Sequence, residues 1–270
     1  MPELPEVETS RRGISPHINN QNITNITLRH HQLRWPIPSN LLNLLKDKKL
    51  LNVDRRAKYL LLRFENGTLL IHLGMSGSLR ICQLNEPAQK HDHVDFQFQK
   101  CLLRYTDPRR FGAILWLGLT PEESPLLNTL GPEPLSDEFT AKMLYRLGKN
   151  RKIPVKQFIM DQKVVTGVGN IYATEALFHA GISPIRTANN ISLKRYQQLV
   201  DAIKKILDEA IKQGGTTLKD FVGGDGKPGY FQQTLYVYGK TGELCPTCKQ
   251  PLTSVKLAAR NSVYCHHCQH

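Results

Sequence analysis

The 270-residue sequence predicts an α+β protein with an antiparallel β part, a helical part and a small C-terminal metal module. Three observations support this prediction. Apolar residues alternate over short stretches up to residue 118. Beyond about residue 136 they recur at helical spacing, and four cysteines stand in two Cys-x-x-Cys pairs after residue 244.

Residues 4–14 are expected to form a short helix at the start of the chain. Pro5 suits a first helical turn, and Gly13 can end the helix. Glu6 and Glu8 lie near the N-terminus, where negative side chains interact favourably with the helix dipole.

Residues 22–118 are expected to form mostly strands. Two apolar stretches, 58–64 and 68–73, flank Asn66-Gly67, which is a strong hairpin signal. Further strands are expected at 93–98, 102–105 and 113–117. Short strands joined by tight turns favour an antiparallel sandwich or barrel.

Residues 119–135 contain four prolines and are expected to be a linker. In the helical part beyond it, residues 193–213 give the clearest pattern, with Ser192 as a candidate N-cap and Gly214-Gly215 as the stop. The apolar face of this helix contains Leu199, Ile203, Ile206, Leu207 and Ile211. The glycine-rich stretch 216–233 is expected to be a mobile loop, and residues 235–270 a terminal module.

The charge balance favours a polyanionic partner. The chain has 36 Lys and Arg against 23 Asp and Glu, a net charge of +13. Nucleic acid fits this excess, although a solvated basic surface or an anionic membrane would fit it too. The sequence has no apolar run long enough to span a bilayer, and acids stand where a signal peptide carries Lys or Arg. We therefore expect a soluble intracellular protein.

The two Cys-x-x-Cys pairs predict one structural zinc ion. Each pair can chelate from a tight knuckle, and together they complete a tetrahedral thiolate shell without an open position. A redox role for one pair fits this spacing less well. The two other cysteines, Cys82 and Cys101, are expected to be small buried residues. The four candidate ligands are Cys245, Cys248, Cys265 and Cys268.

The N-terminus offers a candidate nucleophile. Pro is small enough to favour removal of Met1, which would make the Pro2 nitrogen a secondary amine. Such an amine has a useful neutral fraction near neutral pH and can form a Schiff base with a sugar carbon. Glu3 would lie beside it as a candidate acid/base. Alone, this Met-Pro-Glu start is weak evidence.

Several distinctive motifs run through the whole chain. They are Pro2-Glu-Leu-Pro-Glu-Val-Glu-Thr9, Arg56-Ala-Lys-Tyr-Leu60, His72-Leu-Gly-Met-Ser-Gly77, Lys90-His-Asp-His93, Asp107-Pro-Arg-Arg-Phe-Gly112, Gly167-Val-Gly-Asn-Ile-Tyr172, Gly214-Gly-Thr-Thr217, Tyr238-Gly-Lys-Thr-Gly242 and the cysteine module. In these motifs and in their order, the chain resembles the bacterial formamidopyrimidine-DNA glycosylases (the Fpg/MutM family). Leu4 supports this family, because the sister family, endonuclease VIII, usually has Gly there and prefers oxidised pyrimidines.

The resemblance implies an N-terminal catalytic β-sandwich domain flanked by helices at 1–118, followed by a linker at 119–135. It implies a helix–two-turn–helix DNA-binding domain at 136–234 and a zinc finger at 235–270. A lesion-capping loop is implied at 217–238. The implied partner is damaged double-stranded DNA, the implied state a monomer, and the implied location the bacterial cytoplasm.

The implied activity is removal of oxidised purines (8-oxoguanine and formamidopyrimidines), followed by β,δ-elimination. By this resemblance Pro2 is the nucleophile, Glu3 the acid/base, Lys58 the lysine of β-elimination, and Arg260 the zinc-finger arginine of δ-elimination. The residues matching the family's void-filling set are Met75, Arg109 and Phe111. Those matching its phosphate contacts are His91, Arg151, Lys156 and Asn170, and Arg151 stands where some relatives have Lys.

Three alternatives stay open at this point. The chain could be an endonuclease VIII-like glycosylase for oxidised pyrimidines. It could also be a non-catalytic, zinc-dependent nucleic-acid-binding protein, which would leave Pro2, Glu3 and Lys58 without a role. An N-terminal-proline enzyme acting on small molecules would leave the zinc module and the basic charge unexplained.

Overall fold

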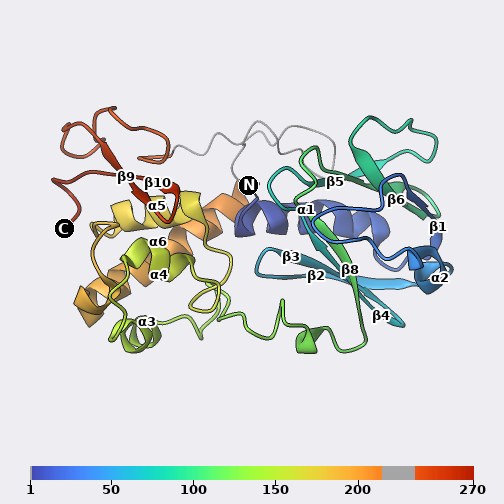
Figure 1. Ribbon diagram of the computed structural model, residues 1–270, viewed down its shortest axis with the longest axis horizontal. Helices are drawn as coiled ribbons and strands as arrows, with labels where there is room; N and C mark the ends of the chain where they lie inside the picture. The colour runs from blue at the N-terminus through green and yellow to red at the C-terminus, as the bar shows by residue number, and fades with distance from the viewer. Residues whose placement is uncertain (1, 215–234) are drawn as a thin grey trace. The chain divides into compact units, whose positions relative to one another are not determined.

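The computed structural model describes residues 2–214 and 235–270 (Figure 1). The described residues fall into two compact units, one comprising 2–128 and 213–214 and the other 129–212 and 235–270. Their boundary lies inside the linker expected at 119–135, which contains the 3-10 helix η1 (Pro121–Glu123). The loop expected at 216–233, and the capping loop at 217–238 except for its last residues, lie outside the described residues.

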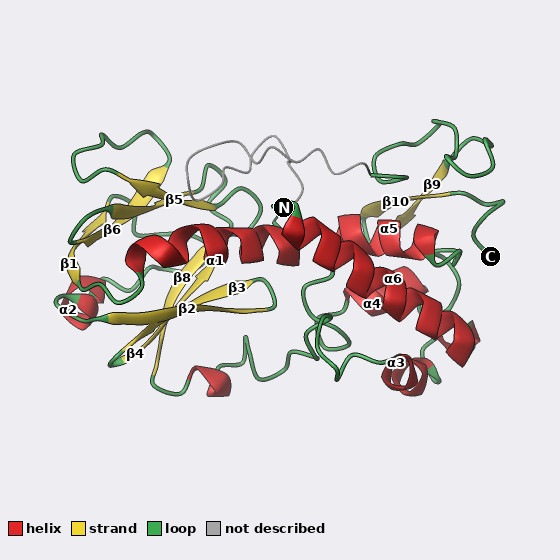
Figure 2. Cartoon of the chain, turned by 180° about the vertical axis from the view of Figure 1, so that it is seen from behind, coloured by secondary structure: helices red, strands yellow, loops and turns green. Residues whose placement is uncertain are grey.

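The first unit contains two four-stranded antiparallel sheets (Figure 2). One sheet has the order β1-β6-β7-β5 and the other β2-β3-β4-β8. The first consists of β1 (Ile23–Leu28), β6 (Asp92–Phe98), β7 (Leu102–Thr106) and β5 (Ser78–Cys82). The second consists of β2 (Leu50–Arg56), β3 (Tyr59–Phe64), β4 (Gly67–His72) and β8 (Ala113–Gly118), and the short helix α2 (Leu41–Leu45) lies between β1 and β2 in the chain.

Residues from both sheets form a single apolar core. Phe96 and Phe98 of β6 are fully buried with Leu60 and Leu62 of β3 in one cluster. Because the two sheets are separate and bury their inner faces together, the first unit is a sandwich rather than a barrel. Cys82 and Cys101 are buried, as the sequence predicted.

Helix α1 (Leu4–Ile18) contacts β2 and β3 of one sheet and β5 of the other. It runs past Gly13, so the predicted end at residue 14 was wrong. Ile14 and Ile18 are completely buried in the sandwich core. Their burial outweighs the modest cost of a glycine inside a helix, roughly 1 kcal/mol.

The hairpin between β3 and β4 differs from the prediction by one residue. Phe64 pairs with Gly67, so the turn is Glu65-Asn66 rather than Asn66-Gly67. Gly67 has φ +150°, and a Cβ there would lie 2.6 Å from the Trp116 ring and 2.8 Å from the backbone of Gly118. The glycine is therefore required by the close approach of β8, not by the turn itself.

The second unit is built around four helices. They are α3 (Ala141–Gly148), α4 (Val155–Met160), α5 (Asn170–His179) and α6 (Leu193–Lys212). Helix α6 packs against α5 and α3, and α5 packs against α4. The predicted helix at 193–213 is confirmed: its five predicted apolar residues are buried, and the Ser192 hydroxyl accepts a hydrogen bond from the Arg195 N–H at 3.4 Å.

The C-terminal module is a β-hairpin of β9 (Thr253–Leu257) and β10 (Arg260–Tyr264). Its turn is Ala258-Ala259, and both residues have positive φ. The module shares its core with α5, because Phe178 packs in one buried cluster with Val237, Leu252 and Val263. A helix of the second unit thus supplies apolar surface that this short segment lacks. None of the helices among the described residues has the length and apolar character that a membrane span requires.

A buried carboxylate joins α1 to the second sheet. Glu8 accepts hydrogen bonds from Arg11 at 2.8 and 3.0 Å, Arg12 at 2.8 Å and Arg55 of β2 at 3.1 Å. Burial acts to raise the pKa of Glu8, but the hydrogen bonds from Arg11 and Arg12 and the arginine charges outweigh it and lower the pKa to about 2.

We predict that Glu8→Gln destabilises the first unit by about 2–3 kcal/mol at neutral pH. The carboxylate has a lower pKa folded than unfolded, so its contribution is complete above 4.5 and disappears as the pH falls toward 2. Urea unfolding of both proteins at several pH values measures this difference.

A matched control is Asp208→Asn, which breaks the exposed ion pair to Lys212 in α6. We expect it to change stability by less than about 0.5 kcal/mol. A Glu8→Gln effect of the same small size, or one that persists at pH 2, would contradict the role of the Glu8 carboxylate.

Candidate functional site

The candidate nucleophile and acid/base stand at the beginning of α1. Pro2 and Glu3 are both buried, and Glu3 is the N-cap residue of the helix. The Glu3 N–H donates to Glu6 Oε2 at 2.8 Å as part of a capping box. This bond fixes the backbone next to Pro2, so helix capping holds the candidate nucleophile in place.

The candidate lysine lies in a turn rather than in a strand, which corrects the expected strand at 58–64. Arg56 of β2 pairs with Tyr59 of β3, so Lys58 is the second residue of the two-residue turn between these strands. The first, Ala57, has φ +54°, and its carbonyl accepts a hydrogen bond from Arg55 Nη1 at 2.9 Å. The turn that carries Lys58 is therefore held by the arginine that also binds Glu8 of α1.

Next to Lys58 lies a histidine that sequence reasoning missed as a site residue. His72 pairs with Tyr59 across β3 and β4, and their ring centroids are 5.1 Å apart. Burial, followed by the charges of Lys58 and Arg34, lowers the pKa of His72 to about 4. Its Nδ1 accepts a hydrogen bond from the Gly74 N–H at 3.2 Å. His72 is the first residue of the motif His72-Leu-Gly-Met-Ser-Gly77, but the motif alone does not indicate that this side chain is largely buried or has cationic neighbours.

The three candidate void-filling residues are exposed on two loops of the first unit. Met75 follows β4, and Arg109 and Phe111 precede β8. Met75 is 38% exposed and Phe111 48%, high values for large apolar side chains. The Arg109 guanidinium lies over the Phe111 ring, 4.8 Å from its centroid. The pair presents an aromatic face and a cation together.

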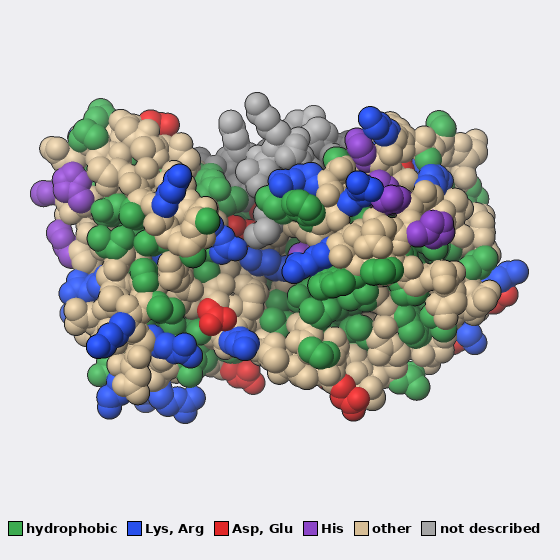
Figure 3. Space-filling model, in the orientation of Figure 1, with side chains coloured by type: hydrophobic (Ala, Val, Ile, Leu, Met, Phe, Trp, Pro, Cys, Tyr) green, Lys and Arg blue, Asp and Glu red, His purple; other side chains and the backbone are tan. Residues whose placement is uncertain are grey.

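His91 lines a cavity of about 340 Å³ that is rich in basic and imidazole groups. Arg110 Nη1 donates to His30 Nε2 at 2.6 Å, and His93 Nε2 donates to the carbonyl of Asp107 at 2.8 Å. Figure 3 shows histidine, lysine and arginine side chains on the same face of the first unit. Sequence reasoning identified only His91 here; the lining also includes Arg29, His30, Lys90, His93 and Arg110.

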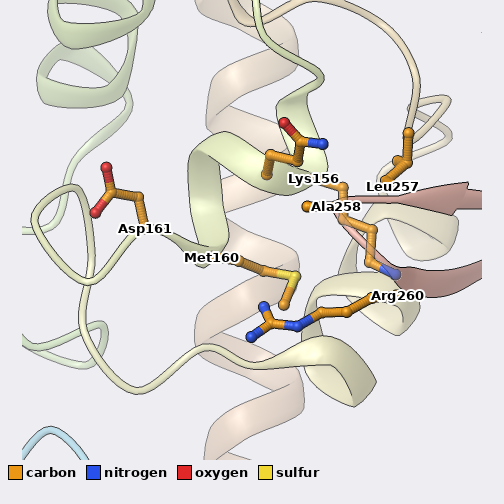
Figure 4. A pocket seen from close by; sticks show the side chains of 7 residues that line it. Lys156, Met160, Asp161, Leu257, Ala258 and Arg260 are labelled. Carbon is orange, nitrogen blue, oxygen red and sulfur yellow. The ribbon is translucent and has the colours of Figure 1, made fainter.

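The second unit brings three other predicted residues together. Lys156 of α4 is 1% exposed, and its Nζ donates to Ser262 Oγ at 2.7 Å and to the Asn261 carbonyl at 3.4 Å. Asn170, the first residue of α5, donates to the same carbonyl at 3.4 Å. Arg260 of β10 and Lys156 both line a pocket of about 160 Å³, and Figure 4 shows Arg260 extending toward Met160. Arg151, between α3 and α4, is exposed.

The four cysteines of the C-terminal module form the predicted metal centre. Their sulfur atoms all lie within 4.8 Å of one another. The Cys245–Cys268 and Cys248–Cys265 sulfur pairs are 3.9 and 3.4 Å apart. Tetrahedral zinc with Zn–S bonds of about 2.3 Å needs sulfur separations of about 3.8 Å. The cluster fits one structural zinc ion, held by two knuckles around the β9–β10 hairpin.

The predicted residues thus form separate groups within each unit. The first unit holds Pro2 and Glu3 at the start of α1 and Lys58 in a hairpin turn anchored to α1 through Arg55 and Glu8. The second holds a pocket between α4 and the β9–β10 hairpin, lined by Lys156 and Arg260 together with Asp161 and apolar side chains. The first group holds a carboxylate and a lysine, and it would gain a secondary amine at Pro2 only after removal of Met1. The second offers hydrogen-bond donors for an anion.

Comparison with known protein families covers most of the chain. The formamidopyrimidine-DNA glycosylase N-terminal domain matches residues 1–114. The H2TH domain of formamidopyrimidine-DNA glycosylase matches residues 130–222. A zinc finger found in FPG and IleRS matches residues 242–270.

Relatives and solved structures match over essentially full length. The formamidopyrimidine-DNA glycosylase of Psychromonas ingrahamii is 75% identical over 269 residues, covering 100% of both chains. That of Hahella chejuensis is 56% identical over 270 residues with the same coverage. The Lactococcus lactis Fpg (MutM) in complex with DNA containing N7-benzyl-Fapy-dG has a TM-score of 0.90 and 34% identity, covering 99% of each chain. MutM from Thermus thermophilus has a TM-score of 0.89 and 38% identity, covering 99% of this chain and 98% of its own.

We predict that zinc removal by a strong chelator unfolds the β9–β10 hairpin, because the module's small core depends on the metal cross-link. Zinc content should fall from one per chain, and the hairpin amides should lose protection from hydrogen exchange. Cys268→Ala should reproduce this loss, whereas Cys101→Ala, in the sandwich core, should keep the zinc. A hairpin that stays protected without metal would contradict the prediction.

Proposed function

We propose that this chain, which belongs to the formamidopyrimidine-DNA glycosylase family, removes oxidised purines from duplex DNA and then cuts the strand at the same site. Its relatives over the full length are DNA glycosylases, and the chain is a DNA glycosylase. The proposal adds the substrates, 8-oxoguanine and formamidopyrimidines, a Pro2 Schiff base and β,δ-elimination.

The observation that carries the proposal is the capped start of α1. Once Met1 is removed, the Pro2 nitrogen is a secondary amine next to the Glu3 carboxyl group, on a backbone fixed by Glu6. The amine attacks C1′, the glycosidic bond breaks, and the damaged base leaves with the bonding electrons and a proton. Glu3 acts as the acid/base while the sugar ring opens and the iminium forms.

Strand cleavage then follows by two eliminations. Loss of a proton from the opened sugar, assisted by Lys58, expels the 3′ phosphate, and a second elimination expels the 5′ phosphate. His72, whose pKa is lowered to about 4, is uncharged at neutral pH and adds no second cation beside Lys58. Arg260, at the zinc module, is proposed to hold the phosphate in the second elimination.

Binding in this proposal depends on base extrusion, which costs a few kcal/mol. The exposed Met75, Arg109 and Phe111 are suited to fill the vacated space, since Phe can wedge a base step and Arg can bind a base edge. The proposed phosphate contacts come from both units, and the net charge of +13 supports them. They are His91, Arg151, Lys156 and Asn170.

The first test is covalent trapping with borohydride. Met1-processed protein, incubated with a duplex containing 8-oxoguanine opposite cytosine, should give an adduct whose peptide map places DNA on Pro2. The matched control is the same protein with Met1 retained, because its Pro2 nitrogen is an amide and cannot form an iminium. Trapping in both forms, or DNA binding without any adduct, would refute the Schiff base. Stronger trapping on an oxidised pyrimidine would favour the endonuclease VIII-like alternative.

The second test concerns Glu3→Gln. The amide can still cap α1, but it cannot exchange a proton, so single-turnover excision should fall by about 100-fold or more. DNA affinity, measured by fluorescence anisotropy, should stay within about two-fold of wild type, because Glu3 makes no proposed phosphate contact. Excision at the wild-type rate would remove Glu3 from the mechanism.

A further inference from the structure

Asp107 is a buried carboxylate that the proposed chemistry does not use. It is 0% exposed and begins the loop that carries Arg109 and Phe111. Its Oδ2 accepts hydrogen bonds from the Gly112 N–H at 2.9 Å and from the Tyr105 hydroxyl at 3.2 Å. Burial, with Asp107 beside it, raises the pKa of Tyr105, so this hydroxyl stays protonated as a donor. One carboxylate oxygen thus joins the two ends of the loop at 107–112.

The other oxygen of Asp107 reaches the turn that carries Met75. The Ser76 hydroxyl donates to Asp107 Oδ1 at 2.6 Å, a short distance typical of a bond to a charged acceptor. The same hydroxyl accepts a hydrogen bond from the Arg109 N–H at 3.1 Å. A single side chain therefore connects the two loops, with Asp107 on one side and the backbone of Arg109 on the other.

The two loops also touch through their backbones. Gly74 has φ +63°, and a Cβ at this position would lie 2.4 Å from the carbonyl carbon of Phe111. Only glycine allows both the backbone conformation and this approach. The turn presenting Met75 therefore lies directly against the backbone of Phe111, while both side chains remain exposed.

We infer that Ser76 and Asp107 are positioning residues that hold Met75, Arg109 and Phe111 together as one rigid wedge for the duplex. The inference rests on the proposed function and deepens it. Exposed side chains on two separate loops would otherwise have to be ordered when they enter the base stack, and that ordering costs free energy. The buried carboxylate fixes their backbones in advance.

Duplex and single-stranded substrates should differ in how much they depend on this wedge. A wedge is needed where a base pair opens and leaves a partner base. A single-stranded abasic site has no partner base and no vacated space, yet it needs the same amine chemistry at Pro2. A defect in the wedge should therefore slow excision from duplex DNA and leave cleavage of the single strand unchanged.

The test compares Ser76→Ala with wild type on both substrates. Single-turnover excision of 8-oxoguanine from duplex should fall roughly ten-fold, as expected for the loss of a charge-assisted hydrogen bond. The rate of cleavage of a single-stranded abasic oligonucleotide should stay within about two-fold of wild type, because this substrate has no partner base and needs no wedge. A two-fold change in rate corresponds to well below 1 kcal/mol. Ser76→Thr keeps the hydroxyl and should restore duplex excision.

A double-mutant cycle tests whether Ser76 acts through the wedge. In a Met75→Ala background, Ser76→Ala should lower the rate of duplex excision by a clearly smaller factor than it does in the wild-type protein. Equal loss on both substrates, full additivity in the cycle, or unimpaired duplex excision by Ser76→Ala would each overturn the inference. A wild-type protein inactive on both substrates would instead overturn the proposed function, and this inference with it.

Discussion

The geometry of the first unit depends on how α1 is fixed to the second sheet, and the Glu8 carboxylate is the charged link between them, in addition to the buried apolar side chains of the helix. Its bonds to Arg11 and Arg12 lie within the helix, whereas its bond to Arg55 crosses to β2. Arg55 also holds the carbonyl of Ala57, next to Lys58. The helix that begins with Pro2 and the turn that carries Lys58 therefore share one electrostatic anchor. Breaking such a buried network is costly because it leaves uncompensated charges.

Sequence patterns predicted the elements whose signals are local. The face of α6 followed directly from its helical period, and the zinc centre followed from two knuckles that each form within four residues. Errors arose where tertiary packing overrides local preference. Gly13 did not end α1, because Ile14 and Ile18 are buried in the core. The β3–β4 turn lies one residue before the predicted position, and Gly67 pairs within the strand, where β8 approaches too closely for a side chain.

Candidate residues were easier to identify than the contacts that support them. Pro2, Lys58 and Arg260 stand in distinctive motifs, so a resemblance can assign each of them a role. The neutral state of His72 and the bridge from Ser76 to Asp107 depend on residues far apart in the chain. Sequence spacing contains no direct information about such contacts. They become visible only when register and burial are known.

The Glu8 network also bears on how the protein responds to salt. Surface charges separated by more than about 8–10 Å are largely screened at physiological ionic strength, whereas buried pairs are screened much less. Contacts between a chain of net charge +13 and phosphates weaken steeply with added salt, because the release of counterions then gains less free energy. Rising ionic strength should therefore release DNA from this glycosylase while leaving the anchor between α1 and β2 intact, so DNA affinity and the geometry of the α1 start and the Lys58 turn respond independently to the ionic environment.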